Sequence, residues 1–394
     1  MDNNNILILG AGIAGVTLAY WLKKFGFNPT LVEHAPKLRE GGYAIDFWGA
    51  GFDVAERMGI LPELDKADLK ITEVTVVSEK GKRKCGIDYI QLKRLMNGRA
   101  FTLLRSDLSK IIYSHLGQHE IIFGDSITNL EQSPAKVTAT FQSGKTRDFH
   151  LVIGADGLHS TIRKLIFGDE SQFEHFYGYY TSSYTIADDL TDRYAFLMYN
   201  TPRKQVAIYS TGERKVTTAF FIFSSQKKIL YAHHDIEAQK QILRNEFEGA
   251  GWQCQKLLAK IDSTSDFYFD VVSQIQMSHW SKDRVTLVGD ACDCPSLLSG
   301  QGSTLAMVGA YILAGELKEA KGNYKTAYER YENIFKPFIR DKQKIAQGFA
   351  KSFVPQSTFS IWMRNIGIKL MALDFVSKKL IKPFKDDKLK LKFY

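Results

Sequence analysis

The sequence predicts an α/β fold that carries an inserted antiparallel β-sheet and additional helices toward its C-terminal end. The first observation is an apolar run at 6–9 that enters a turn with glycine at Gly10, Gly12 and Gly15. The second is a stretch at 173–225 in which aromatic and β-branched runs alternate with turn residues. The third is a helical pattern over most of the chain after residue 302. A Rossmann-like domain interrupted by a sheet accounts for all three.

The glycine turn has the spacing of a dinucleotide-binding site. A buried strand precedes it and a helix at 14–25 follows it. Gly10 permits the tight turn, Gly12 lets the backbone approach phosphates, and Gly15 lets helix and strand pack closely. The same pattern would fit a glycine turn that merely packs, but that alternative leaves the acid described next unexplained.

Glu33 ends the next apolar run, close to the usual spacing of about twenty residues between the turn and a ribose-binding acid. The backbone amides around Ile13 and Ala14 open the helix, and the positive end of its dipole favours an anion. We therefore expect a dinucleotide pyrophosphate at this helix N-terminus.

Composition sets the broad class. The 394 residues are 44% hydrophobic, which is ordinary for a globular protein of two or three domains. The sequence shows no signal peptide and no apolar stretch of membrane-spanning length, so we expect a cytoplasmic protein without a membrane span. The four cysteines are too few and too scattered for a disulfide framework or a zinc site, and no metal is expected.

Most of the net charge of +9 lies near the C-terminal end, where 351–394 holds ten basic and three acidic residues. A solvated helix face and tail is the expected reading, and contact with an anionic membrane surface is the alternative. No nucleic-acid motif accompanies the charge, so no nucleic-acid partner is expected.

Periodicity and turn residues place the remaining elements in order. Gly59 ends a helix that begins at residue 50, and Ser106 is a plausible N-cap for a later helix. The predicted strands are 71–78, 85–91, 120–123, 136–141, 148–153, 194–199, 205–210, 216–223 and 284–288. The predicted helices are 50–58, 108–116, 235–247, 253–260, 302–318, 360–371 and 373–380.

Two further apolar strands end in a glycine followed by an aspartate. The run at 151–153 leads into Gly154 and, two residues later, Asp156, and the run at 285–288 leads into Gly289 and Asp290. With the opening turn, these motifs resemble the group A flavoprotein monooxygenases, which share the fold of the para-hydroxybenzoate hydroxylase family. The three motifs and their order span roughly residues 6 to 315.

The resemblance implies FAD as the cofactor, with its pyrophosphate at the first turn and its adenosine ribose at Glu33. Reduced flavin carries negative charge, and the glycine-rich helix start after the third motif supplies amides and a favourable dipole for it. The further cofactor contacts that the resemblance implies are Arg39 and Arg105 near the flavin, Asp156 in a motif tied to FAD and the nicotinamide donor, Asp290 on the ribityl or pyrophosphate portion, and Pro295, Gly300 and Gly302 against the flavin ring.

Structural alternatives stay open for these residues. Asp290 could cap a helix, the Asp-Gly pair at Asp156 is a common turn, and the two arginines could lie on the surface. Departures from the common family pattern occur at Cys292-Asp293, Thr304 and Gly309. Cys292 and Cys294 could suggest a redox pair, but a disulfide between them would be strained, which favours core thiols.

The resemblance also implies the reaction. NADPH would dock transiently and reduce FAD, and oxygen would form a flavin hydroperoxide that hydroxylates the substrate. The cofactor carries this chemistry, so no catalytic side chain is predicted. The expected partners are a small-molecule substrate, NAD(P)H and O2, and we expect a monomer.

The inserted aromatic sheet is the expected substrate site. Tyr194, Phe196 and Met198 share one face of their strand, and Phe221 and Phe223 share a face of another. They predict a wide apolar pocket for a polycyclic aromatic molecule. The alternative is a sheet packed on its own core.

The C-terminal helices and the segment at 41–48 resemble the tetracycline destructases, which inactivate tetracycline antibiotics and so confer resistance. In that group an extra C-terminal helix covers the substrate entrance, and an aspartate matching Asp46 lies near the flavin. Two other functions stay open: an FAD hydroxylase of another aromatic or polyketide metabolite, and a flavin-binding sensor or sequestering protein. The expected domains are 1–70, 97–170 and 276–350 for FAD, 71–96 and 171–275 for the substrate, and 351–394 for the C-terminal helix.

Overall fold

A mostly parallel sheet forms the centre of the nucleotide-binding domain. The computed structural model describes residues 4–38, 42–191, 194–210, 216–371 and 389–394. Within these residues the sheet has six strands in the order β17-β18-β11-β1-β2-β7, and β1 pairs in parallel with both β11 and β2. The strands are β1 (Asn5–Leu9), β2 (Asn28–Glu33), β7 (Glu120–Phe123), β11 (Leu151–Gly154), β17 (Ser281–Lys282) and β18 (Val285–Leu287).

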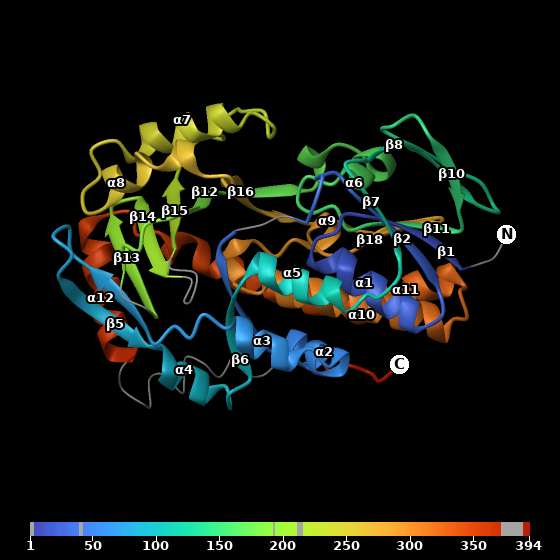
Figure 1. Ribbon diagram of the computed structural model, residues 1–394, viewed down its shortest axis with the longest axis horizontal. Coiled ribbons are helices and arrows are strands. Elements are labelled where there is room, and N and C mark those ends of the chain that lie inside the picture. The colour runs from blue at the N-terminus through green and yellow to red at the C-terminus, as the bar shows by residue number, and fades with distance from the viewer. Residues whose placement is uncertain (1–3, 39–41, 192–193, 211–215, 372–388) are drawn as a thin grey trace.

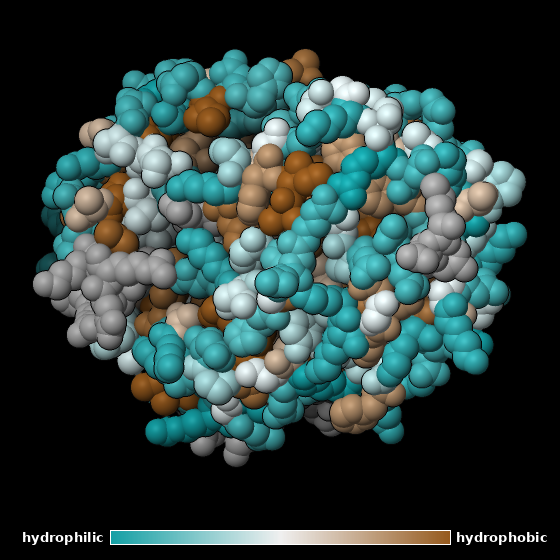
Figure 2. Space-filling view, turned by 45° about the vertical axis from the view of Figure 1, so that its right-hand side comes forward, coloured by the Kyte–Doolittle hydropathy of each residue, from teal (hydrophilic) through white to brown (hydrophobic). Residues whose placement is uncertain are grey.

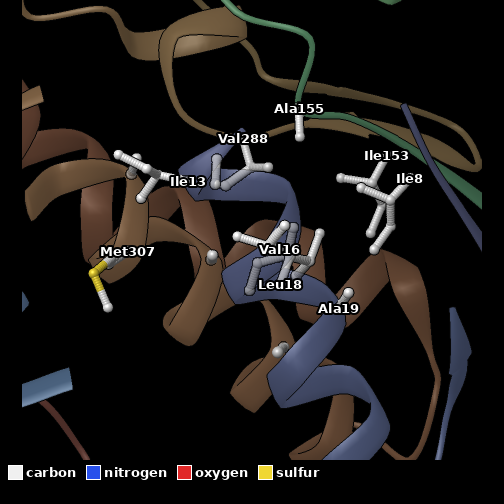
Figure 3. Packing of buried hydrophobic residues seen from close by; sticks show 14 of the residues in the cluster. Ile8, Ile13, Val16, Leu18, Ala19, Ile153, Ala155, Val288 and Met307 are labelled. Carbon is white, nitrogen blue, oxygen red and sulfur yellow. The ribbon is translucent and has the colours of Figure 1, made fainter. Parts of the chain in front are cut away.

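Helices cover this sheet and bury its apolar strands. Figure 1 shows α1, α10 and α11 running side by side along the domain. In Figure 3, Ile8 and Ile153 of the sheet lie toward Val16 and Ala19 of α1. These helices are α1 (Ile13–Lys24), α2 (Ala50–Met58), α3 (Leu61–Ala67), α5 (Arg105–Ser114), α6 (Thr161–Phe167), α10 (Gly302–Glu319) and α11 (Tyr324–Phe353).

A separate three-stranded sheet consists of β8 (Ile127–Gln132), β9 (Val137–Phe141) and β10 (Thr146–Phe149). The strand predicted at 148–153 is therefore two strands in two sheets, with His150 between them. The His150 amide donates to Asn5 O (2.9 Å), which directs the chain into the central sheet. Apolar residues, Phe149 and Leu151, flank His150 directly, so periodicity alone did not reveal the bend.

The inserted sheet has seven strands among the described residues, in the order β16-β12-β15-β14-β13-β4-β5. It is not wholly antiparallel, because β13 pairs with β4 in parallel. Helices α7 (Ile236–Phe247) and α8 (Cys254–Leu258) lie beside it in Figure 1. Its strands are β4 (Glu73–Val77), β5 (Arg83–Asp88), β12 (Glu174–Ile186), β13 (Ala195–Thr201), β14 (Lys204–Ser210), β15 (Thr217–Ser224) and β16 (Tyr268–Ile275).

Two local expectations were wrong. The strand predicted to continue to residue 91 ends at 88, because Asp88 accepts a hydrogen bond from the Gln91 amide (2.9 Å) and starts α4 (Tyr89–Leu95). Helix α5 begins at Arg105 with Leu104 as its N-cap, so Ser106 lies inside the first turn.

The remaining elements connect the two domains. A two-stranded sheet pairs β3 (Ala44–Trp48) with β6 (Ala100–Leu104), and α12 (Thr358–Met371) contacts β5 and β13. The helix expected at 373–380 lies outside the described residues. The short elements are η1 (Glu170–Gln172), η3 (Ile261–Ser263), α9 (Asp290–Asp293) and η4 (Leu297–Ser299).

Among the described residues, no helix combines the length and the apolar character needed to cross a membrane. Figure 2 shows one face of the molecule, on which hydrophobic residues form several patches between hydrophilic ones.

Candidate active site

The three glycine-containing motifs meet in space. A Cβ atom added to Gly10 would lie 2.4 Å from the carbonyl oxygen of Ala155. One added to Gly289 would lie 3.0 Å from the Cβ of Ala14. The Ala155 amide also donates to Leu9 O (2.8 Å). Segments separated by more than a hundred residues therefore form one site.

The first turn combines two kinds of glycine. Gly10 has φ +103°, and a Cβ on Gly15 would overlap Gly10 O at 1.9 Å, so only glycine fits these two positions. At Gly12, by contrast, no described atom lies within 4 Å of an added Cβ. Helix α1 begins beside this open space with no side-chain cap and no acidic residue in its first turn. The free amides of Ile13 and Ala14 and the room at Gly12 fit a pyrophosphate.

Glu33 lies at the same turn. Its carboxylate accepts hydrogen bonds from the amides of Ala11 (2.8 Å) and Ala35 (2.9 Å). These bonds hold the acid at the end of β2, next to the first turn, where a ribose of the bound dinucleotide would lie.

Asp156 shapes the second motif. Its carboxylate accepts from the Ser160 hydroxyl (2.6 Å) and the Ile162 amide (3.1 Å), so it organises the start of α6. Burial raises the pKa of Asp156 despite these hydrogen bonds. Its contact with a cofactor stays a prediction.

Arg163 ties the second motif to the third, and the sequence analysis assigned it no role. Its guanidinium is fully buried and donates to Ala291 O (2.8 Å), Leu158 O (2.6 Å) and Glu170 (2.7 Å). The sequence signal for this role was the position of Arg163 at the end of the second motif. A buried arginine at that position can donate to the backbone carbonyls of its own loop and of a neighbouring loop.

The third motif leads to the start of α10. A Cβ on Gly302 would lie 4.0 Å from Asp290 Oδ1, and α10 has neither a side-chain cap nor an acid in its first turn. Gly300 adopts a left-handed conformation (φ +62°), and Pro295 O accepts from Gln274 Nε2 (3.1 Å). The geometry leaves the α10 amides available to an anionic ring edge, which fits reduced flavin.

The departures from the family pattern have packing explanations. Thr304 Oγ1 donates to Trp48 O (3.1 Å). A Cβ on Gly309 would lie 2.8 Å from the ring of Phe335, so glycine makes room for α11. Cys292 and Cys294 are free and buried, as expected for core thiols.

Arg105 lies in a charged group between the two domains. Burial lowers the pKa of this guanidinium, but Tyr43, Tyr268, Asp290 and Asp270 outweigh that effect and raise it. Burial raises the pKa of Asp290, and Arg105 opposes that change. The predicted cofactor residues Arg105 and Asp290 are therefore brought together.

Asp46 has an unusual environment. It accepts hydrogen bonds from the Tyr89 hydroxyl and from Thr102 Oγ1 (3.2 Å). Desolvation by the surrounding protein raises the pKa of Asp46. The residue still keeps part of its surface accessible to solvent. The other residue expected near the flavin in this region, Arg39, lies outside the described residues.

Strand register separates the predicted substrate residues onto two faces. Phe196 pairs with Tyr209 and Met198 with Ala207, and all four lie on one face. Phe221 pairs with Val206 on the other face.

Phe221 and Phe223 belong to a packed core. Both are fully buried, and their ring centroids lie 5.0 and 6.1 Å from that of Phe247 in α7. This correction supports the alternative of a sheet packed on its own core at these two positions, because helix α7 covers that face. Tyr194 precedes β13 with φ +70°, and its carbonyl accepts from the Thr72 amide (3.1 Å).

Besides the predicted Phe196, the opposite face carries aromatic residues that sequence reasoning missed. Phe196 and Tyr209 stack at 5.2 Å, and Tyr43 contacts both Phe220 (5.6 Å) and Tyr268 (5.7 Å). The alternation of 217–224 contained the signal, because Phe220 must face away from Phe221. We call this side of the sheet the aromatic face.

A hollow of about 530 Å³ lies beside His159 and His233. His159 bonds Asp270 (2.9 Å) and Glu170 (3.0 Å), and its ring lies 3.6 Å from that of His233. Burial lowers the pKa of His159, but the two carboxylates outweigh burial and raise it to about 10. His159, His233 and Asp270 are close enough to share a metal ion. In the structure these groups form an ion-pair cluster around His159.

Comparison with known proteins assigns this geometry to a family. The family model for an FAD binding domain matches residues 3–340. A flavin-dependent monooxygenase of Legionella longbeachae is 38% identical over 91% of this chain and 92% of that protein. The crystal structure of tetracycline destructase Tet(51) is 34% identical, with a TM-score of 0.87 over 99% of this chain and 100% of that one. HpxO of Klebsiella pneumoniae, solved with FAD and uric acid, is 20% identical with a TM-score of 0.77 over 97% and 96% of the chains, which shows the fold alone.

Proposed function

The chain belongs to the FAD-binding-domain family of flavin-dependent monooxygenases, and we propose that its substrate is a polycyclic aromatic compound of the tetracycline class. The observation that carries this substrate class is the full-length likeness to Tet(51), which continues past the FAD-binding domain through α12. The aromatic face supports it, because Phe196 and Phe220 lie on the side of the sheet opposite α7 and are only partly buried there.

In this proposal NADPH, a proton, O2 and the substrate yield NADP+, water and the hydroxylated substrate. Bound FAD supplies the redox chemistry, accepting two electrons from the nicotinamide and passing them to oxygen. The chain's own residues bind and orient. Gly12 and the first amides of α1 hold the pyrophosphate, and Glu33 holds the adenosine ribose.

Charge at the flavin ring is set by the α10 N-terminus and by Arg105. Both are positive, so both stabilise negative charge on the reduced ring. The Tyr43 side chain contacts Phe220 and Tyr268 of the sheet, and so closes the site against water between the two domains. Helix α12 covers the substrate entrance.

The test is NADPH consumption by the FAD-loaded protein with and without tetracycline. We expect tetracycline to accelerate NADPH oxidation at least about tenfold. We also expect the drug's absorbance to fall and the product to gain one oxygen atom by mass spectrometry. Replacing NADPH with NADH measures the donor preference. The control is the Gly12→Val variant, which should not retain FAD.

Two outcomes would overturn the proposal in different ways. Acceleration by other phenols but not by tetracycline would indicate a hydroxylase of another aromatic or polyketide metabolite. Tight FAD binding without oxygen consumption on any phenol would indicate a flavin-binding sensor or sequestering protein.

A further inference from the structure

Helix α12 places apolar and polar side chains together on the side that faces the inserted sheet, and several large apolar side chains on its outer side. Ile368 packs on Val76 and Cys85, and Arg364, one turn earlier, reaches Gln205 of β14. A surface helix normally keeps its charged side chains on the outer side, so the inward position of Arg364 is unusual. The outward side chains Phe359, Trp362, Met363 and Leu370 are 69, 57, 50 and 49% exposed.

The guanidinium of Arg364 is only partly paired. Arg364 Nη1 donates to Gln205 Oε1 at 3.4 Å, but its Nε and Nη2 are buried and bond nothing among the described residues. No described carboxylate forms an ion pair with this guanidinium. Desolvation accordingly lowers the pKa of Arg364, and only Cys85 opposes that shift. A buried cation without a counter-charge is costly unless a ligand supplies one.

Asn200 adds a second unpartnered group at the same place. It is 8% exposed, and neither Nδ2 nor Oδ1 has a hydrogen-bond partner in the part of the chain that the structure describes. Strand register pairs Asn200 of β13 directly with Gln205 of β14, the residue that Arg364 contacts. Arg364, Asn200 and Gln205 therefore form one polar group, and we call it the α12 polar site.

The α12 polar site lies on the aromatic face. Along β13, Phe196, Met198 and Asn200 point to the same side, and Phe196 stacks on Tyr209 at the other end. Tyr209 Oη accepts from the Ala44 amide (2.5 Å), next to Tyr43 of the candidate active site. At about 3.3 Å per residue, the polar site is about 13 Å along the strand from Phe196. That separation is comparable to the length of a linear polycyclic compound.

We propose that the α12 polar site binds an anionic oxygen group at one end of a flat aromatic substrate whose rings lie along Met198 and Phe196. The guanidinium of Arg364 pairs with a carboxylate or ionised enol, and the Asn200 amide donates a further hydrogen bond. Helix α12 then selects the substrate as well as covering it. This inference rests on the proposed function only in placing the substrate on the aromatic face.

The test compares two ligands that differ in charge. Anthraquinone-2-carboxylate is a flat anion, and anthraquinone-2-carboxamide is its neutral counterpart. We measure binding of each to the FAD-loaded protein by equilibrium dialysis, without NADPH. We expect the wild-type protein to bind the carboxylate about tenfold more tightly than the amide, as a charged hydrogen bond to a buried guanidinium requires.

Two variants separate recognition from a structural role. Arg364→Met removes the cation, so carboxylate binding should fall about tenfold while amide binding stays within about twofold. Asn200→Asp gives Arg364 a carboxylate partner within the protein, so it should fold with a raised melting temperature and lose carboxylate binding by a similar factor. The matched control is Met363→Gln on the outward face of α12, which should leave both affinities unchanged.

Equal binding of the two ligands by the wild-type protein would overturn the inference. Equal weakening of both ligands in Arg364→Met would do the same, since it would indicate that Arg364 only fastens α12 to the sheet. If Arg364→Met does not fold, Asn200→Asp decides alone, and its retention of carboxylate binding counts against the inference. The dialysis requires no turnover, so a failure of the tetracycline assay leaves this result readable.

Discussion

The three glycines of the first turn are required for two different physical reasons. Gly10 and Gly15 are needed by the protein itself, because any Cβ there would overlap backbone atoms. Gly12 has an ordinary φ of −72° and open space around it. The space that a side chain would fill is the space that we assign to the pyrophosphate. FAD binding should therefore depend on Gly12 more strongly than folding does.

This difference predicts the behaviour of Gly12→Val. The variant should fold with a melting temperature within a few degrees of wild type, because an added Cβ meets no described atom within 4 Å and φ is ordinary. Its FAD content should fall at least about tenfold, because the side chain occupies the pyrophosphate position. The absorbance of the purified protein gives the ratio of flavin to protein. Thermal unfolding followed by circular dichroism gives the melting temperature. Full flavin content in the variant would contradict the assignment.

His159 predicts a pH dependence of stability. Its folded pKa of about 10 exceeds the ordinary value of 6.5, so its protonated form stabilises the folded state. The contribution is complete below about pH 6.5 and is lost as the pH rises toward 10. Since the ring is partly exposed, we expect it to be on the order of 2 kcal/mol.

Urea unfolding of wild type and His159→Gln over this pH range measures that contribution. The difference in free energy of unfolding should be largest below pH 6.5 and should shrink between pH 6.5 and 10. His279→Gln is the control, because that side chain is 79% exposed. A difference that does not change with pH would refute the ion-pair assignment.

At the scale of elements, the C-terminal segment contacts both domains. Helix α12 lies beside β5, whereas Figure 1 places the C-terminal end beside α2. There Arg57 of α2 donates to Lys392 O (2.7 Å) and Leu391 O (3.0 Å). Tyr394 lies against Gly315 of α10, where an added Cβ would overlap its ring at 2.2 Å. The end of the chain is therefore packed into the nucleotide-binding domain.

Substitutions at Tyr394 test this packing. Tyr394→Ala should lower the free energy of unfolding by about 2–4 kcal/mol, because it removes an aromatic ring that packs closely against Gly315. Tyr394→Phe should cost about 1 kcal/mol, because it loses only the hydrogen bond to Glu316 (2.8 Å). Chemical denaturation of the three proteins gives both values, and equal stability of all three would show that the tail contributes nothing.

At the scale of the whole molecule, the site unites segments from three distant parts of the chain. Arg163 bonds Ala291 O, and Gly289 packs on Ala14, so each motif supports the next. A cofactor that contacts all three should stabilise the entire nucleotide-binding domain. This coupling makes FAD affinity measurable through unfolding.

We expect FAD at a hundredfold excess over its Kd to raise the free energy of unfolding of the apoprotein by about 2.7 kcal/mol. Thermal or urea unfolding with increasing FAD checks this value. Gly12→Val should show no such increase at the same concentration. An apoprotein whose stability is independent of FAD would contradict a site built from the three motifs.

Local sequence patterns were sufficient to predict the part of the candidate site that lies at the first glycine turn. The strand, the glycine spacing and Glu33 are adjacent in sequence, and each acts through backbone geometry that a few residues determine. The same holds for α2, whose predicted bounds of 50–58 match the structure. FAD as cofactor and the monooxygenase family came from the resemblance to a known family that these three motifs carry.

The residues of the proposed substrate site could not be predicted from local sequence patterns. Alternation shows that Phe220 and Phe221 face opposite sides, but not which side α7 will cover. Arg163, Tyr43 and the α12 polar site likewise depend on contacts between residues far apart in the chain.

The sequence alone therefore determined the glycine turn and the position of the acid beside it, because these depend on short-range backbone constraints, and its motifs indicated the family by resemblance. Only the tertiary structure decided which aromatic residues pack under α7 and which lie on the aromatic face. It also brought Arg364 into contact with Gln205, the strand partner of Asn200. Burial is a property of packed elements, and no local pattern records which element will lie on which face.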